Sequence, residues 1–100
     1  KNTEPSWFGF PVTLKKSAET ERRDLLQYLD QNKIGTRLLF AGNIICQPYF
    51  KEQKYRIHGD LSSTDLVMNS TFWLGVYPGL TTQMLDYVVD QLELYFGVGF

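Results

Sequence analysis

Two apolar segments, at residues 7–14 and 71–77, most constrain the fold of this 100-residue chain. Side chains alternate in both with period two, which is typical of a strand that buries one face. Each segment contains tryptophan, an apolar residue, glycine and another apolar residue. Because a strand glycine often marks the close approach of an aromatic ring, this echo suggests that the two strands are neighbours. The residues expected to point toward the core are Phe8, Phe10, Val12 and Leu14, and Phe72, Leu74 and Val76.

Pro11 lies within the first of these segments. Proline donates no hydrogen bond to a strand ladder, so we expect this strand at an edge of the sheet or bulged. A third strand is expected at residues 34–40, where it ends before Gly42 and Asn43. Residues 44–50 contain a proline and predict a loop or a short helical turn, and residues 51–59 are polar and expected to be exposed.

Two main helices are expected to lie between and after the strands. The first is predicted to start at a Ser17 cap and to stop at Asn32 in the left-handed conformation. At helical spacing one side of this helix is formed by Ala18, Arg22, Leu25, Leu26 and Leu29. The last helix is predicted to start at a Thr81 cap, with a hydrophobic staple from Leu80 to Leu85. Its buried stripe is formed by Leu85, Val88, Val89, Leu92 and Phe96.

A shorter helix is expected to start at Ser63 or Thr64 and to end at Met68. The main order is therefore strand, helix, strand, irregular segment, strand, helix. This order predicts an α+β domain in which two main helices pack on one face of a three-stranded sheet. A length of 100 residues fits one such domain.

Composition and charge exclude several classes of function. The net charge is −1 and no basic stripe occurs, which argues against a nucleic-acid partner. No apolar run approaches the roughly 20 residues of a membrane span. No signal peptide is visible, and the single cysteine, Cys46, fits a reducing compartment, so we expect a cytoplasmic protein. The sequence starts at Lys1 without methionine, which predicts that it is a fragment.

Few residues suggest chemistry. The sequence has no glycine-rich phosphate loop, and His58, its only histidine, is expected to be solvated beside Asp60 and Asp65. Arg37 interrupts an apolar strand. It either points to solvent from the outer face or pairs with an anion, for which its forked donors are suited, and the pattern favours neither. Asn43 either supplies a left-handed turn or contributes to a site.

Longer motifs carry a resemblance. Residues 34–43 are Ile-Gly-Thr-Arg-Leu-Leu-Phe-Ala-Gly-Asn, residues 47–50 are Gln-Pro-Tyr-Phe, and residues 71–81 are Thr-Phe-Trp-Leu-Gly-Val-Tyr-Pro-Gly-Leu-Thr. These motifs resemble the DegT-like sugar aminotransferase family, in its branch of CDP-keto-deoxyglucose dehydrases of lipopolysaccharide O-antigen biosynthesis. The broader family often has a histidine where this chain has residues 39–45, and this departure favours the dehydrase branch over true aminotransferases.

The resemblance implies the small C-terminal domain of a fold-type I transferase dependent on pyridoxal or pyridoxamine phosphate. Residues 1–6 would be a linker from a missing N-terminal large domain, and residues 7–100 the small domain. In the dehydrases a histidine replaces the usual cofactor lysine, and neither that histidine nor the cofactor is expected here. The full-length enzyme would bind a two-iron, two-sulfur cluster, form a homodimer and work with an iron–sulfur flavin reductase. Its substrate would be CDP-4-keto-6-deoxyglucose, on the way to dideoxysugars.

For the site, we expect this chain to contribute no catalytic or metal-binding residue. The segment from Arg37 to Asn43 is expected to face the active-site cleft. Phe8 and Phe10, on the first strand, are further candidates for substrate contacts, and core packing is favoured for at least one of them. The cleft side should be an exposed apolar and aromatic patch, and the isolated chain should be inactive. Cys46 is expected to be a packed free thiol without a role in the cluster. The alternatives are a stand-alone ligand-binding or regulatory α+β module and a single-strand RNA binder, against which the near-neutral charge counts.

Overall fold

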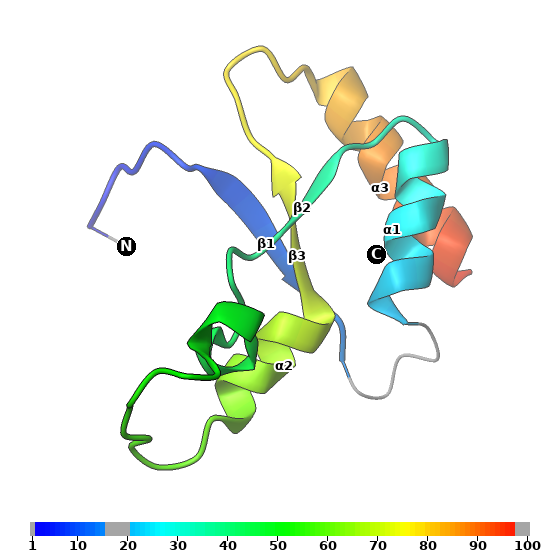
Figure 1. Ribbon diagram of the computed structural model, residues 1–100. Coiled ribbons are helices and arrows are strands. Elements are labelled where there is room, and N and C mark those ends of the chain that lie inside the picture. The colour runs from blue at the N-terminus through cyan, green and yellow to red at the C-terminus, as the bar shows by residue number, and fades with distance from the viewer. Residues whose placement is uncertain (1, 16–20, 98–100) are drawn as a thin grey trace.

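The computed structural model describes residues 2–15 and 21–97, and within them three strands form one sheet beside three α-helices (Figure 1). Residues 44–50 form two short 3-10 turns, as the sequence predicts. The elements in chain order are β1 (Gly9–Thr13), α1 (Arg22–Gln31), β2 (Thr36–Leu38), the turns Ile44–Cys46 and Pro48–Phe50, α2 (Ser62–Ser70), β3 (Thr71–Gly75) and α3 (Thr82–Phe96).

The sheet has the order β1-β3-β2, and both pairings are antiparallel. The expectation that the two glycine-containing strands are neighbours is confirmed, with Gly9 directly opposite Gly75. Pro11 lies in β1, which is an edge strand. The free side of an edge strand makes no ladder hydrogen bonds, so a residue without an N–H is tolerated there. In the same register Trp73 is the cross-strand partner of both Pro11 and Arg37.

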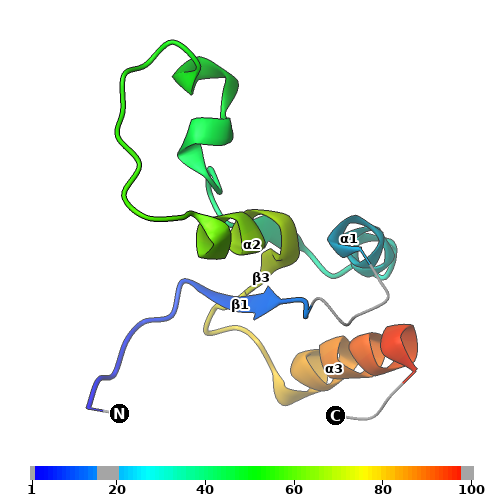
Figure 2. The same cartoon turned by 90° about the horizontal axis from the view of Figure 1, so that it is seen from below.

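Helices α1 and α3 lie side by side on one side of the sheet (Figures 1 and 2). The expected α+β architecture, with two main helices on one face, is confirmed. Buried hydrophobic side chains join α1 to β3. They are Leu25, Leu29, Ile34 and Phe72. The half-buried side chains that pack against them are Val12, Leu14, Leu26, Tyr28, Leu74, Val88, Leu92, Tyr95 and Phe96.

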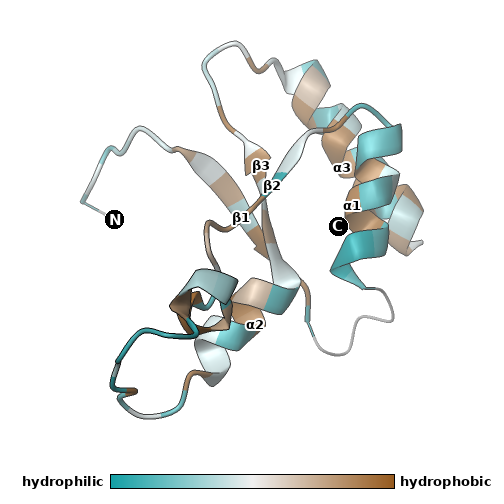
Figure 3. Cartoon of the chain, viewed as in Figure 1, coloured by the Kyte–Doolittle hydropathy of each residue, from teal (hydrophilic) through white to brown (hydrophobic). Residues whose placement is uncertain are grey.

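This core is small for the length of the chain. The radius of gyration is 16.3 Å, whereas a compact domain of 100 residues has about 13 Å. Part of the excess comes from residues 44–61, which project away from the sheet (Figure 2). Figure 3 shows apolar residues on β1 and the 3-10 turns as well as on α1 and α3.

The predicted buried faces are correct only in part. Phe8 and Phe10 are 78% and 61% exposed, so only Val12 and Leu14 of the first strand's four residues reach the core. In α3, Leu85 and Val89 are exposed as well, while Val88, Leu92 and Phe96 pack inward. Alternation and helical spacing identify which residues share a side of a strand or helix. They do not show what covers that side, and within the described residues Phe8, Phe10, Leu85 and Val89 remain exposed.

Backbone conformation differs from the prediction at two turns. Asn32 ends α1 with φ −97°, and the left-handed residue is Lys33 at φ 66°. Asn43 is extended at φ −88°, and its turn is made by Phe40 and Gly42, at φ 44° and 64°. A left-handed stop at Asn32 and a left-handed Asn43 were therefore both wrong.

Helix ends agree better with the sequence. The Thr81 hydroxyl accepts a hydrogen bond from the backbone N–H of Met84, as expected of a cap. Helix α2 begins at Ser62 and ends at Ser70, so it is longer than predicted. Before it, the carboxylate of Asp60 accepts hydrogen bonds from the backbone N–H and hydroxyl of Ser62. These bonds place the pKa of Asp60 below its usual value. The predicted cap Ser17 lies outside the described residues, and Glu21 precedes α1.

Arg22 links the first helix to the central strand. Its guanidinium donates to the backbone carbonyl of Met68, at the end of α2, and to that of Thr71 at 3.0 Å. The side chain was predicted to share the inner side of α1, and it is half-buried there. These bonds hold the junction between α2 and β3 against α1.

We expect Arg22→Ala to lower the free energy of unfolding by about 1.5–3 kcal/mol, because it removes charge-assisted bonds to two carbonyls. Arg23→Ala, at the exposed neighbouring position, should change it by less than about 0.5 kcal/mol. Urea unfolding followed by circular dichroism measures both, and equal effects of the two substitutions would contradict this role of Arg22.

Candidate functional site

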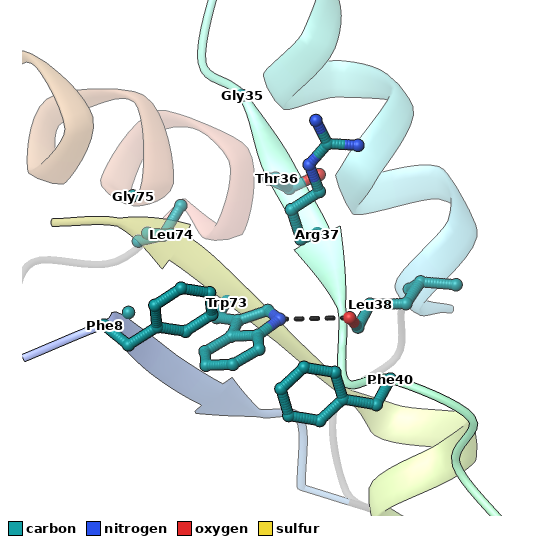
Figure 4. Close-up of a pocket in the computed structure, with 10 residues that line it drawn as sticks. Phe8, Gly35, Thr36, Arg37, Leu38, Phe40, Trp73, Leu74 and Gly75 are labelled. Carbon is teal, nitrogen blue, oxygen red and sulfur yellow. Dashed lines mark hydrogen bonds between the residues drawn. The ribbon is translucent and has the colours of Figure 1, made fainter.

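An open groove of about 540 Å³ lies on the face of the sheet opposite α1 and α3 (Figure 4). Side chains alternate along β3, so Phe72 points into the core while Trp73 points to this outer face. The volume is within the range of small-molecule sites. The groove is lined by Phe8, Gly9, Gly35, Thr36, Arg37, Leu38, Phe40, Trp73, Leu74 and Gly75.

Trp73 is held in the groove by several contacts. Its indole N–H donates to the backbone carbonyl of Leu38 at 3.0 Å. The rings of Phe8 and Phe40 lie edge-on to it, with centroids 5.0 and 5.2 Å from its own (Figure 4). A Cβ on Gly9 would lie 2.5 Å from the indole, so glycine there lets the ring lie against β1. Trp73, Phe8 and Phe40 are called the aromatic cluster below.

Two members of this cluster were not among the site residues named from the sequence. The alternation predicts that Trp73 points away from Phe72, but nothing in the pattern assigns it a role. Phe40 lies in the segment from Arg37 to Asn43 that was expected to face the cleft, although it was not named individually. Phe40 follows β2. Its side chain is 79% exposed, and its backbone is in the left-handed region. The spacing of Arg37 and Phe40 on one segment was the only available signal, because pairing of β2 with Trp73 cannot be read from the sequence.

Of the four predicted substrate contacts, Arg37 and Phe8 line the groove and Phe10 and Asn43 do not. Arg37 is exposed on the outer face, so its charge is not buried within this chain. Its guanidinium extends away from the aromatic cluster (Figure 4). Pro11 is opposite Trp73 in the register, so the preceding residue, Phe10, points to the other face of the sheet. A substrate contact stays a prediction for each of the four.

Asn43 makes contacts within the chain instead. It is 4% exposed, its amide nitrogen donates to Asp65 at 2.8 Å, and its amide oxygen accepts from the backbone N–H of Ile45. The first bond ties the turn after β2 to α2, and the second caps the first 3-10 turn. Gly42 before it packs on Met68, whose side chain a Cβ would meet at 2.5 Å.

The residues that carry most chemistry lie outside the groove. His58 is exposed, and so is the thiol of Cys46, which corrects the expectation of a packed cysteine. Within residues 2–15 and 21–97, no three His, Cys, Asp or Glu side chains are grouped so that they could hold a metal ion. In the same ranges no helix is long and apolar enough to cross a membrane.

We expect Asn43→Ala to lower the free energy of unfolding by about 1–3 kcal/mol, since it leaves buried polar groups without partners. A double-mutant cycle with Asp65→Ala should give a coupling energy of at least about 0.5 kcal/mol. Urea unfolding of the three variants measures it. Additive effects on stability, combined with a loss of substrate affinity, would show that Asn43 acts on a ligand instead.

Comparison with known proteins gives the context of this groove. Residues 1–93 match the DegT/DnrJ/EryC1/StrS aminotransferase family. The lipopolysaccharide biosynthesis protein RfbH of Salmonella typhimurium strain LT2 is 58% identical over all 100 residues, which correspond to 23% of its length. A dTDP-4-dehydro-2,6-dideoxy-D-glucose 3-dehydratase from Saccharopolyspora spinosa is 48% identical over 91 residues, 91% of this chain and 20% of that protein.

A solved structure has the same fold. It is a GDP-4-keto-6-deoxymannose-3-dehydratase (ColD) variant with bound GDP-perosamine, and it superimposes with a TM-score of 0.81 at 24% identity. The match covers 89% of this chain and 23% of the ColD chain. The chain thus spans about a fifth of the length of the relatives that it matches.

Proposed function

This chain belongs to the DegT/DnrJ/EryC1/StrS aminotransferase family, and we propose that it is the C-terminal small domain of a pyridoxamine or pyridoxal phosphate-dependent sugar-nucleotide 3-dehydrase. The specific reaction we propose removes the 3-hydroxyl of CDP-4-keto-6-deoxyglucose in the biosynthesis of dideoxysugars and lipopolysaccharide O-antigen. Residues 1–6 would join residues 7–100 to a large domain.

Two observations support the class of substrate. The relatives named above include 3-dehydratases of dTDP- and GDP-linked deoxysugars, as well as a lipopolysaccharide biosynthesis protein. The nucleotide differs between them, so the sugar-nucleotide class is better supported than CDP itself. CDP is proposed from the motifs at residues 34–43 and 71–81, which resemble the CDP-specific branch.

The observation that carries the proposal is the groove itself. It combines an aromatic cluster with the exposed guanidinium of Arg37, on the face of the sheet opposite α1 and α3. A guanidinium is suited to the phosphates of a nucleoside diphosphate, and exposed rings are suited to its apolar faces. Arg37 and Phe8 are therefore the contacts that we propose first, and Phe10 and Asn43 remain secondary candidates.

The groove does not fit the cofactor. No lysine or histidine lines it, whereas the family needs one of these residues at the cofactor. No grouped set of ligands for an iron–sulfur cluster occurs among the described residues either. We therefore place the phosphate cofactor, which supplies the electron sink, and the two-iron, two-sulfur cluster in the large domain. The residues of this chain would bind and orient the substrate and exclude water.

The full-length protein is proposed to act as a homodimer and to receive electrons from an iron–sulfur flavin reductase. The alternative, a stand-alone ligand-binding module, is separated from this proposal by the gene. A reading frame that continues upstream of Lys1 into a large domain supports the enzyme, and its absence supports the module.

We expect Arg37→Ala in the full-length enzyme to lower kcat/KM by about 10- to 150-fold, the equivalent of about 1.5–3 kcal/mol for a lost charge-assisted contact. The fold should be retained, because the side chain is exposed. Steady-state kinetics with CDP-4-keto-6-deoxyglucose and a thermal melt measure the two effects separately.

Arg23→Ala on α1 is the matched control, since it removes another exposed arginine outside the groove. Its kinetics should equal those of the wild type. If Arg37→Ala changes neither kcat nor KM, Arg37 is a surface residue and the substrate-binding proposal for it fails.

Cys46→Ala in the full-length enzyme should leave the iron content unchanged. The thiol is free and exposed, and a cluster needs several cysteine ligands close together. Iron determination on the two purified proteins is the measurement, with protein concentration measured in parallel. Loss of iron in the variant would place Cys46 in the cluster.

A further inference from the structure

The aromatic cluster points to one specific contact with the substrate. We propose that Trp73 and Phe40 form a surface on which a ring of the substrate stacks, while Arg37 holds a phosphate of the same ligand. This inference rests on the proposed function and deepens it, because it assigns two further binding residues and the chemical group that they recognise.

Trp73 is fixed before any ligand binds. Its indole is oriented by the carbonyl of Leu38 and lies against β1 at Gly9, while two phenylalanine edges flank it. A stacking surface of this kind loses little conformational entropy on binding. Tryptophan also offers a large flat face to bases and to the C–H faces of sugars.

Phe40 has an unusual backbone for its exposure. At φ 44° it occupies the left-handed region, which disfavours every residue with a Cβ, yet its side chain is 79% exposed. Burial of its ring within this chain therefore does not offset the backbone cost. Strained residues of this kind occur at sites that clamp ligands. The backbone at Phe40 aims its ring at Trp73, on the side of the groove opposite Phe8 (Figure 4).

Gly35 and Gly75 also line the groove, and the chain itself gives no reason for glycine at either position. A Cβ on either would meet nothing within 4 Å, and neither has a positive φ. This contrasts with Gly9, where the indole requires the missing Cβ. Open backbone beside Trp73 leaves room for a ligand to approach closely.

The position of Arg37 limits which ring of the ligand can stack on Trp73. Arg37 and Trp73 are direct cross-strand partners, so their Cβ atoms are about 4.5–5.5 Å apart on one face. A ligand that contacts both must carry its negative charge close to a ring. In a sugar nucleotide two groups meet this condition, namely the nucleoside and the deoxyhexose, since each is bonded to the diphosphate.

Two substitutions in the full-length enzyme test the proposal. Gly75→Val fills the open floor at a position where a Cβ would meet no atom within 4 Å, and Phe40→Gly removes the ring while relieving the left-handed backbone. We expect both to raise the Kd of the CDP-linked sugar at least fivefold. Phe40→Gly should leave the melting temperature unchanged or higher, which a merely structural ring would not do. Val76→Leu, next to the groove but outside its lining, is the control and should bind as the wild type does.

Three probes identify the ring by isothermal titration calorimetry: CDP, glucose 1-phosphate and the CDP-linked sugar. Weaker binding of CDP in both variants assigns the stack to the nucleoside, and weaker binding of glucose 1-phosphate assigns it to the hexose. Unchanged affinity for all three probes in both variants overturns the inference, even where Arg37→Ala lowers turnover. A wild-type enzyme that binds no nucleotide sugar fails the proposed function itself, which is a different result.

Discussion

The alternation of side chains along β3 is the constraint on which the rest of this chain depends. Phe72 is fully buried between the sheet and α1, and the next residue, Trp73, lies on the opposite face. Because β3 is the central strand, this single step assigns one face of the sheet to the core and the other to the groove. A shift of one residue in its register would exchange the two faces.

Several contacts protect that register. Arg22 bonds the carbonyl of Thr71, at the start of β3, and the hydroxyl of Thr13 shares a hydrogen bond of 2.7 Å with that of Thr71. On the outer face the indole of Trp73 packs over Gly9, where a Cβ would lie 2.5 Å from it. The same pairings thus stabilise the fold and position the groove, so the orientation of Trp73 follows from the packing of Phe72.

The sequence predicted those parts of the structure that depend on neighbouring residues along one strand or helix. Alternation in the two tryptophan-containing strands, their adjacency and the cap at Thr81 all follow from local pattern. The exposure of Leu85 and Val89 could not be predicted, because a pattern identifies a shared side but not what covers it. For the same reason the alternation could not decide between the core and the cleft for Phe8 and Phe10. The left-handed residues Lys33 and Phe40 give no signal either, since neither residue type favours that conformation.

The same distinction applies to the site. Arg37 stood out because a charge interrupted an apolar run, and Phe8 because it is an aromatic residue of the first predicted strand. Trp73 and Phe40 come from segments more than 30 residues apart and meet only through the pairing of β2 with β3. The sequence left Asn43 available for a ligand, but the structure pairs it with Asp65, and such a pairing across the fold has no local pattern.

The division of the sheet into two faces also separates stability from binding. All four buried hydrophobic residues lie on the helix side or at its margin, whereas the exposed residues of the groove contribute little burial. Exposed groove residues such as Arg37 can therefore change with small cost to folding, whereas Gly9 and Trp73 are fixed by their mutual contact. A backbone fixed by one face leaves exposed positions on the other face free to differ between proteins of the same fold, and the relatives named above include enzymes of dTDP- and GDP-linked sugars.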